Sequence, residues 1–303
     1  MSNVYTYYYG GLTFQSAVAL PLMPHKAPAS SADVDVTFGP LPEALAECLR
    51  AKPHFQMYAD GTAILRSPDG IRLMFYNGRS LRIEVPEGLD ARLVQSWLIG
   101  PGLGLILHQR GMPPLHACAV SKAGRALAIA GDSGAGKSTT ARALMERGYD
   151  LMAEDQAVID PASPTLFPGV PDLRLWAVAA RQFGEKTDER ARVGAHEDKF
   201  TISASRARFD HTPRPLTALF LLSSDPAEQP VSRRLSGGAA AHALHRHIFR
   251  QRLATFMGHG AEMFRWATTL AAQVPVFEVR RPHDLSRLDA LAAHLEQVAE
   301  QLP

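Results

Sequence analysis

An eight-residue glycine-rich segment constrains this chain more than any other feature, and we call it the glycine loop. It matches G-x-x-x-x-G-K-[ST], the pattern of phosphate-binding loops. It consists of Gly131, Asp132, Ser133, Gly134, Ala135, Gly136, Lys137 and Ser138. The apolar run 126–130 before it predicts a buried strand. Residues 137–147 after it have apolar side chains at helical spacing, and Gly148 is a stop signal. Strand, glycine loop and helix follow one another in the order that anion binding requires.

Glycine residues let the backbone curl so that successive N–H groups point inward, and the helix N-terminus adds positive potential. Lys137 is placed to reach the β- and γ-phosphates, the Ser138 hydroxyl to hold Mg²⁺, and Thr139 is the next nucleotide-binding candidate. The alternative interpretation is a glycine-rich turn that binds nothing. The loop alone therefore predicts a bound nucleoside triphosphate, without specifying a reaction.

The overall composition is that of a globular protein and gives no sign of a nucleic-acid-binding or membrane-spanning one. The chain has 303 residues, enough for about two domains or for one large domain with an extension. Its 46% hydrophobic and 20% charged residues are ordinary for a globular protein. A net charge of +2 gives no electrostatic reason to expect a nucleic-acid partner. Cys48 and Cys118 lie far apart and favour two reduced thiols. No apolar run reaches the roughly 18 residues of a membrane span, and the N-terminus lacks signal-peptide features. We expect a soluble cytoplasmic protein without a membrane partner.

The first third of the chain is rich in strand and turn signals. Residues 5–14 are compatible with one strand, and residues 41–49 with a short helix. Between residues 55 and 85, apolar runs alternate with turn signals, of which Asn77-Gly78 is the strongest. These patterns predict a small antiparallel sheet. It carries no catalytic constellation, so docking of a partner and packing support for the rest of the chain remain equal alternatives.

Further elements are expected on either side of the glycine loop. Residues 115–120 and the turn at 122–124 place the strand of the loop in a hairpin, which differs from the parallel crossovers usual for nucleotide-binding folds. Helices are expected at 90–107, interrupted at residues 100–102, and at 239–256, 263–272 and 285–302. Strands are expected at 158–159, 216–222 and 274–279.

Charged residues that follow apolar strands are the other candidates for chemistry. Glu154 and Asp155 end an apolar stretch that begins at residue 150, as expected for partners of Mg²⁺ or of a reacting hydroxyl. A solvated surface turn is the alternative interpretation. Asp172 and Arg174 alternate with leucines, so both face one side of a strand. Lys199 opens another alternating stretch and is a candidate contact to phosphate or substrate.

Several of these segments together resemble the catalytic domain of HPr kinase/phosphorylase. The likeness is carried by residues 115–117, the hairpin turn, the glycine loop, residues 147–149 and the acids at 154–155. Residues 110–111, 168–176 and 275–277 look more like the HPr-kinase-related proteins associated with lasso-peptide biosynthesis. The resemblance implies an α/β P-loop kinase core of the HPr kinase and phosphoenolpyruvate-carboxykinase-like type over residues 95–303. It implies an antiparallel β-rich accessory region over residues 1–94.

The resemblance also implies an activity, that of an ATP- and Mg²⁺-dependent serine kinase. In that family the loop and Lys137 hold the phosphates, and Ser138 ligates Mg²⁺. Glu154 occupies the position of the general base, which is usually an aspartate, and Asp155 matches a second acid that acts as metal ligand or base. The longer side chain of Glu154 leaves open which of the two acids meets the substrate hydroxyl.

Three further positions match the family pattern. His116 corresponds to a histidine that orients the catalytic acid. The resemblance implies that Asp172, which stands where the family has a glutamate, helps to hold Mg²⁺, and that Arg174 steadies the developing phosphoryl charge. Physical chemistry supports these roles, because phosphoryl transfer needs positioning and compensation of charge on the transferred oxygens.

The acceptor implied by the closer likeness is a serine of a peptide or small protein, such as a lasso-peptide precursor. Two alternatives remain open. One is a kinase that acts on HPr or a small metabolite and also runs the reverse phosphorolysis. The other is an ATP-sensing module without transfer activity, which the glutamate at 154 favours. The hexameric assembly of HPr kinases makes a homo-oligomer one candidate state.

Overall fold

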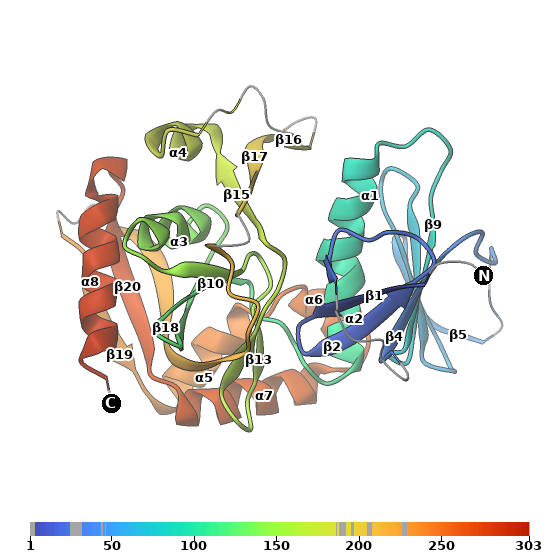
Figure 1. Cartoon of the computed structure of the whole chain (residues 1–303). Helices are drawn as coiled ribbons and strands as arrows, with labels where there is room; N and C mark the ends of the chain where they lie inside the picture. Colours follow the sequence, from blue (N-terminus) through green and yellow to red (C-terminus); the bar gives the residue numbers. More distant parts are fainter. Residues whose placement is uncertain are drawn as a thin grey trace. The chain divides into compact units, whose positions relative to one another are not determined.

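The chain divides into two compact units in a computed structural model (Figure 1). The structure describes residues 4–24, 32–43, 45, 47–185, 187, 192–194, 197–204, 208–225 and 229–302. The first unit comprises Met1–Pro113 and Arg250–Ala261, and the second comprises Pro114–Phe249 and Glu262–Pro303. The first change of unit along the chain therefore lies between Pro113 and Pro114. The domain boundary expected between residues 94 and 95 stays a prediction. Both units contain sheets and helices, so the protein is a mixed α/β chain.

The first unit is built on one nine-stranded sheet in the order β3-β1-β2-β4-β9-β8-β7-β6-β5. Its strands are β1 (Tyr5–Tyr9), β2 (Leu12–Ser16), β3 (Met23–Pro24), β4 (Val34–Phe38), β5 (Cys48–Lys52), β6 (Phe55–Tyr58), β7 (Thr62–Arg66), β8 (Arg72–Tyr76) and β9 (Ser80–Glu84). The meander from β6 to β9 confirms the hairpins expected from the turn signals. Strand β4, however, pairs in parallel with both β2 and β9, so the sheet is not purely antiparallel. Parallel pairing between distant segments leaves no local signal in a sequence.

Two expectations for this region were wrong. Residues 5–14 do not form one strand, because Gly10 and Gly11 adopt positive φ and turn β1 back onto β2. The helix expected at 41–49 is replaced, in the residues that the structure describes, by the edge strand β5, which pairs with β6. Pairing with a neighbouring strand outweighs the helical preference of a short segment.

The helix expected over residues 90–107 is present, and its expected interruption at residues 100–102 is a π-helical turn through which the helix continues. Helix α1 (Ala91–Trp97) leads into the π turn Leu98–Gly102, which contains Pro101, and then into α2 (Leu103–Gln109). Four apolar side chains of α2 are completely buried, which is the pattern of a helix inside a core. The wider π turn accommodates the proline ring without ending the helix. Helix α6 (Gln251–Phe256) belongs to the same unit, where the Phe256 ring contacts Phe55 at 5.5 Å between ring centroids.

A sheet with mixed strand directions organises the second unit. Strands β10 (Ala117–Lys122) and β11 (Arg125–Gly131) form the expected hairpin. Strand β11 also pairs in parallel with β18 (Arg214–Asp225), and β18 pairs in parallel with β20 (Val276–Pro282). Strand β12 (Asp150–Ala153) pairs antiparallel with β10. The sheet also contains β13 (Val158–Asp160), β14 (Thr165–Phe167) and β19 (Val231–Leu235). The carboxyl ends of β11, β18 and β20 share one edge, where open α/β sheets bind ligands.

Helices and a small sheet complete the second unit. The helices include α3 (Lys137–Glu146), α4 (Ala177–Gln182), α5 (Gly237–Arg246), α7 (Gly260–Gln273) and α8 (Leu288–Glu300). The single helix expected at 239–256 was wrong, since α5 ends at Arg246 and α6 begins at Gln251. Between them the backbone pairs with the segment before β10, and Arg250 adopts a φ of +51°. Strands β15 (Asp172–Trp176), β17 (Glu197–Ser203) and β16 (Arg192–Gly194) form the small sheet.

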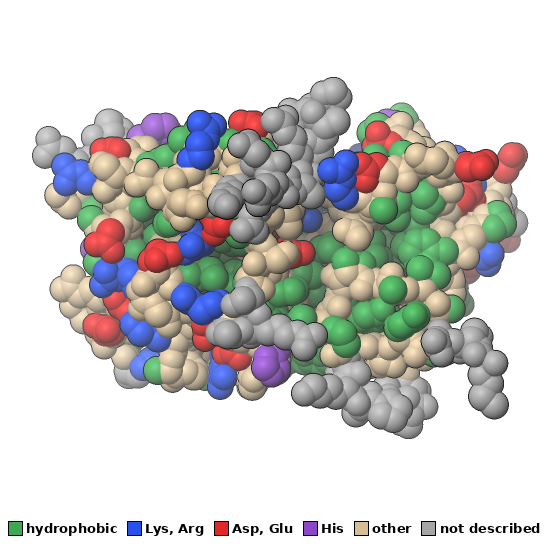
Figure 2. Space-filling model, turned by 45° about the horizontal axis from the view of Figure 1, so that its top comes forward, with side chains coloured by type: hydrophobic (Ala, Val, Ile, Leu, Met, Phe, Trp, Pro, Cys, Tyr) green, Lys and Arg blue, Asp and Glu red, His purple; other side chains and the backbone are tan. Residues whose placement is uncertain are grey.

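Charged side chains of both signs lie on the face drawn in Figure 2. On the face drawn in Figure 2, blue and red side chains alternate, and no single-sign patch covers the described residues of that face. Among the described residues, the structure has no helix that is long and apolar enough to cross a membrane.

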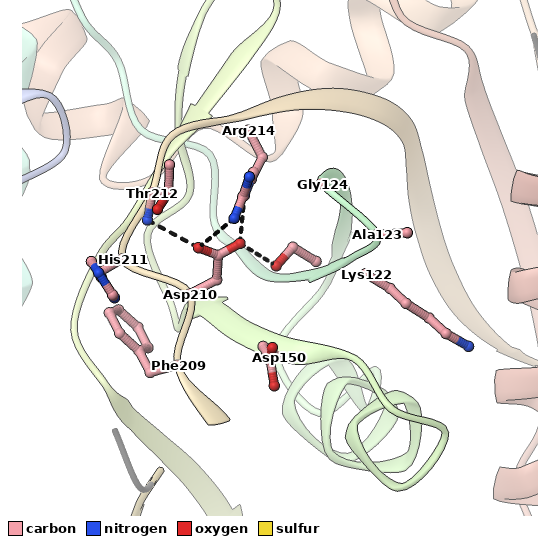
Figure 3. Close-up of a pocket in the computed structure, with 10 residues that line it drawn as sticks. Lys122, Ala123, Gly124, Asp150, Phe209, Asp210, His211, Thr212 and Arg214 are labelled. Carbon is pink, nitrogen blue, oxygen red and sulfur yellow. Dashed lines mark hydrogen bonds and ion pairs between the residues drawn. The ribbon is translucent and has the colours of Figure 1, made fainter. Parts of the chain in front are cut away.

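A hydrogen-bonded carboxylate stabilises the end of the sheet opposite the glycine loop. Asp210 accepts hydrogen bonds from the Ser121 hydroxyl at 2.7 Å, the Arg214 Nε at 2.6 Å and the Thr212 N–H at 3.0 Å (Figure 3). Its side chain is 10% exposed. Burial raises the pKa of Asp210, but these hydrogen bonds outweigh that effect and leave the pKa below its ordinary value. The carboxylate therefore joins the end of β10 to the start of β18.

We expect Asp210→Asn to destabilise the second unit by about 1 kcal/mol at neutral pH, because the amide leaves the buried Ser121 hydroxyl and the partly exposed Arg214 without their charged acceptor. A carboxyl whose pKa is depressed in the folded state contributes stability above its unfolded pKa of about 4 and loses it as the pH falls. The difference from the wild type should therefore shrink in acid. Thermal and urea unfolding at pH 7 and pH 3.5 measure it. Asp289→Asn, at a side chain that is 83% exposed, serves as the control.

Candidate functional site

The glycine loop has the backbone conformation that its sequence predicts. Strand β11 ends at Gly131 and helix α3 begins at Lys137. Gly131, Gly134 and Gly136 have φ values of +148°, +82° and +93°, which other residues rarely adopt. A Cβ atom on Gly131 would lie 2.6 Å from the carbonyl oxygen of Leu222. Glycine is therefore required at this point both for conformation and for close approach of the neighbouring strand.

The Lys137 ammonium lies inside the loop. It donates hydrogen bonds to the carbonyl oxygens of Gly131 at 2.9 Å and Asp132 at 3.1 Å. The residue is only 8% exposed, and burial lowers the pKa of its ammonium. Because its hydrogen-bond acceptors are neutral carbonyls and not a carboxylate, no direct ion pair neutralises the charge of this ammonium. It is thus well placed to bind an anion at the mouth of the loop.

Glu154 connects the loop to strand β12. Its Oε1 accepts a hydrogen bond from the Ser138 hydroxyl at 2.8 Å, and its Oε2 accepts one from the Cys118 thiol at 2.8 Å. Glu154 is 6% exposed, and burial raises the pKa of its carboxyl group. Burial likewise raises the pKa of the Cys118 thiol. Ser138 and Glu154 therefore present adjacent oxygen atoms at the first turn of α3.

Asp155 has a different environment from its neighbour. Its Oδ1 lies 2.9 Å from the His116 Nδ1, and its Oδ2 lies 4.0 Å from the Arg174 Nη1. Burial raises the pKa of Asp155, but the hydrogen bond and charge of His116, with the charges of Arg174 and Lys199, lower it to about 2. Asp155 also adopts a φ of +66°, a left-handed conformation that aspartate tolerates better than most residues. It is therefore ionised at neutral pH and held in a sharp turn.

Strand pairing explains why these residues meet. Ala119 of β10 pairs with Ala153 of β12, so the residues just before Ala119 lie beside those just after Ala153. Cys118 and His116 thereby reach Glu154 and Asp155. The other edge of β10 pairs with β11, which ends in the glycine loop. The hairpin thus places both acids beside the loop.

The other site residues predicted from the sequence lie at different distances from the glycine loop and the two acids. Asp132, Ser133 and Gly134 form the exposed tip of the loop, and Thr139 is buried in α3. Arg174 of β15 reaches Asp155, and the charge of Lys199 on β17 acts on both acids. Asp172 instead accepts a hydrogen bond from Ser203 at 2.7 Å. In the described part of the chain, no direct contact joins Asp172 to Ser138 or Asp155. Its role in metal binding stays a prediction.

Three residues near the loop were not singled out for this site from the sequence. Cys118 contacts Glu154, as described above. His247 lies between α5 and α6, with its Nδ1 4.0 Å from the Asp132 Oδ1. Burial lowers the pKa of His247 and favours the neutral imidazole. Arg281, at the end of β20, donates a hydrogen bond to the Ala135 carbonyl at 2.7 Å. None of the three belongs to the loop motif, and only the folded chain brings them together.

The donor set fits a triphosphate with a hard divalent cation. The loop supplies a helix N-terminus and the Lys137 ammonium, and Ser138 and Glu154 supply oxygen atoms. Among the described residues, no three His, Cys, Asp or Glu side chains are grouped as a self-sufficient metal site. Mg²⁺ usually takes one or two protein oxygens and completes its shell with phosphate oxygens and water, and Ser138 and Glu154 offer two such oxygens.

Comparisons with known proteins do not establish a family. No family model and no curated protein matches the chain. A solved structure described as the Hpr(Ser) kinase/phosphatase from Coxiella burnetii aligns with 62% of this chain and 98% of its own, at 13% identity and a TM-score of 0.32. A likeness this weak carries no weight for the activity, so the resemblance seen in the sequence stays a prediction. The function has to be inferred from the geometry around the glycine loop.

Proposed function

We propose that this protein is an ATP- and Mg²⁺-dependent kinase that phosphorylates a serine hydroxyl. The observation that carries the proposal is the meeting of the two acids with the glycine loop. Glu154 contacts Ser138 at the start of α3, and its neighbour Asp155 is held separately by His116. A loop that only bound nucleotide would have no need of a second, ionised acid beside it.

The site residues form two groups, one for the phosphates and the metal and one for the acceptor hydroxyl. The loop N–H groups and Lys137 would hold the β- and γ-phosphates, and Ser138 and Glu154 would hold the metal. Bound Mg²⁺ neutralises charge that develops on the phosphate oxygens during transfer. Because Glu154 rather than Asp155 contacts Ser138, we assign Glu154 to the metal side. Asp155 then remains for the acceptor side, together with His116 and Arg174.

On the acceptor side, Asp155 would accept a hydrogen bond from the attacking serine hydroxyl and take its proton as the new bond forms. The serine oxygen bonds to the γ-phosphorus, the bond from that phosphorus to the β–γ bridging oxygen breaks, and ADP leaves with the bond electrons. Arg174 and Lys137 would compensate charge on the three transferred oxygens. His116 would keep Asp155 ionised and oriented through its 2.9 Å contact.

For the acceptor we propose a peptide or small protein, with a lasso-peptide precursor as the first candidate. This choice rests on the sequence resemblance alone. A homo-oligomer is proposed on the same basis.

The direct test incubates the purified full chain with γ-labelled ATP, Mg²⁺ and the peptide or small protein encoded beside its gene. We expect label on serine, dependent on both Mg²⁺ and the acceptor. ATP binding without transfer to that acceptor, to HPr or to serine-containing peptides would contradict the kinase proposal and favour a nucleotide sensor. Release of pyrophosphate from the phosphoserine product in the presence of phosphate would reveal the reverse activity.

A further inference from the structure

Arg281 is a charged residue that the proposed reaction does not use and that the fold nevertheless buries. It is 6% exposed and ends strand β20, which runs parallel to β18 in the sheet that carries the glycine loop. Its register partner is Ser224 of β18, while Leu222 of the same strand pairs with Gly131 of the loop. The side chain therefore starts two strands away from the loop, at the same edge of the sheet.

The guanidinium reaches across that edge and supports the loop from behind. Its Nε donates to the Ala135 carbonyl at 2.7 Å, and its Nη1 donates to the Pro282 carbonyl at 2.8 Å. A Cβ on Gly136 would lie 2.9 Å from Nη2 and 3.1 Å from Cζ. The guanidinium therefore packs against the face of Gly136 where a side chain would begin, and the φ of +93° at this residue independently favours glycine.

The charge of Arg281 has no counter-charge in the described part of the chain. Both hydrogen-bond acceptors are neutral carbonyls, and no described carboxylate forms an ion pair with it. Burial lowers the pKa of Arg281, in keeping with its 6% exposure and its neutral hydrogen-bond acceptors. A buried cation without a paired anion costs free energy. Its presence directly behind an anion-binding loop suggests that the missing anion is the ligand.

We propose that Arg281 is a positioning residue for the nucleotide, which holds the Ala135–Gly136 backbone in place and adds fixed positive charge behind the loop. It would favour a triphosphate over nucleotides with fewer phosphate charges, without touching the transferred group. The inference rests on the proposed function in one respect, namely that the loop binds ATP. It adds a determinant of charge selectivity that lies 144 residues beyond Lys137 in the sequence.

The neighbouring arginine provides a matched control. Arg280 precedes Arg281 on the same strand, but it is exposed and, by strand alternation, points to the opposite face of the sheet. Arg280→Met and Arg281→Met remove the same charge one residue apart. A general effect of net charge would appear in both variants, whereas an effect of the guanidinium behind the loop would appear only in Arg281→Met.

The experiment measures ATP, ADP and AMP affinities of the full chain by calorimetry with Mg²⁺, together with thermal unfolding. We expect Arg281→Met to weaken ATP binding by about tenfold, roughly 1.4 kcal/mol, and to weaken AMP binding much less. Its melting temperature should stay close to that of the wild type, since a buried unpaired charge has been replaced by an apolar chain. Arg281→Lys, which keeps the charge, should recover most of the preference for ATP over AMP. Arg280→Met should bind all three nucleotides like the wild type.

Several results would overturn the inference. One is a folded Arg281→Met that binds ATP within twofold of the wild type. Another is a variant that loses thermal stability and weakens all three nucleotides equally, because that pattern indicates a structural role only. If Arg281→Met does not fold, Arg281→Gln decides the matter, since it retains a donor for Ala135 without the charge, and unchanged ATP affinity there refutes the proposal. A wild-type chain that binds no ATP would instead contradict the proposed function itself.

Discussion

Lys137→Met should reduce phosphoryl transfer by roughly 10²- to 10³-fold, the size of effect seen when one preorganised donor to a developing charge is removed. The ammonium is the only charged group that the loop motif itself places inside the loop, where it is hydrogen-bonded to the carbonyls of Gly131 and Asp132. Methionine fills a similar volume but offers neither a proton nor a charge. The fold should survive, because the strand, the glycines and the helix that define the loop are unchanged and only two hydrogen bonds to loop carbonyls are lost.

Initial rates with labelled ATP and thermal unfolding of the same preparation measure this effect. Lys122→Met is a suitable control. Lys122 lies at the other end of β10, where its partly exposed ammonium pairs with the buried Glu296 at 2.6 Å. This control should transfer phosphate like the wild type. A Lys137→Met chain that is folded and retains the wild-type rate would show that the loop does not carry the reaction.

Local sequence patterns predicted the loop well, because everything that defines it lies within one short segment. The glycines determine the left-handed backbone, the apolar run before them forms β11, and the hairpin turn at 122–124 follows from Ala123 and Gly124, both of which have positive φ. The position of Glu154 and Asp155 just beyond a strand was also correctly expected. These features depend on contacts between residues close in sequence.

The environment of the loop could not be predicted in the same way. Arg281 and His247 reach it from segments more than a hundred residues away, and no spacing rule connects them to the motif. The break between α5 and α6 could not be predicted either, because it also depends on contacts between segments that are distant in the sequence. Helical apolar spacing runs through residues 247–250, but the His247 carbonyl accepts a hydrogen bond from the His116 N–H at 2.7 Å, and the Phe249 N–H donates to the Pro114 carbonyl at 2.8 Å. Tertiary backbone pairing thus overrides the local preference.

Glu154→Gln and Asp155→Asn should impair the enzyme in two different ways. Glu154 shares a hydrogen bond with Ser138, so a neutral amide there should mainly weaken metal binding. Loss of a group this close to a metal typically changes affinity by about 10- to 100-fold. We therefore expect Glu154→Gln to require a higher Mg²⁺ concentration for half-maximal rate and to recover much of its rate at saturating Mg²⁺.

Asp155→Asn should behave differently, because Asp155 is paired with His116 and its pKa of about 2 keeps it ionised throughout the neutral range. An amide cannot take the proton of the attacking hydroxyl, and loss of a general base costs about 10²- to 10⁴-fold in rate. The Mg²⁺ dependence and the KM for ATP should change little, and added Mg²⁺ should not restore the rate. Asp150→Asn, at the start of strand β12 that precedes the two acids, should leave both properties unchanged. The opposite pattern, with Mg²⁺ rescuing Asp155→Asn but not Glu154→Gln, would reverse the assignment. It would show that the contact between Ser138 and Glu154 does not mark the metal side.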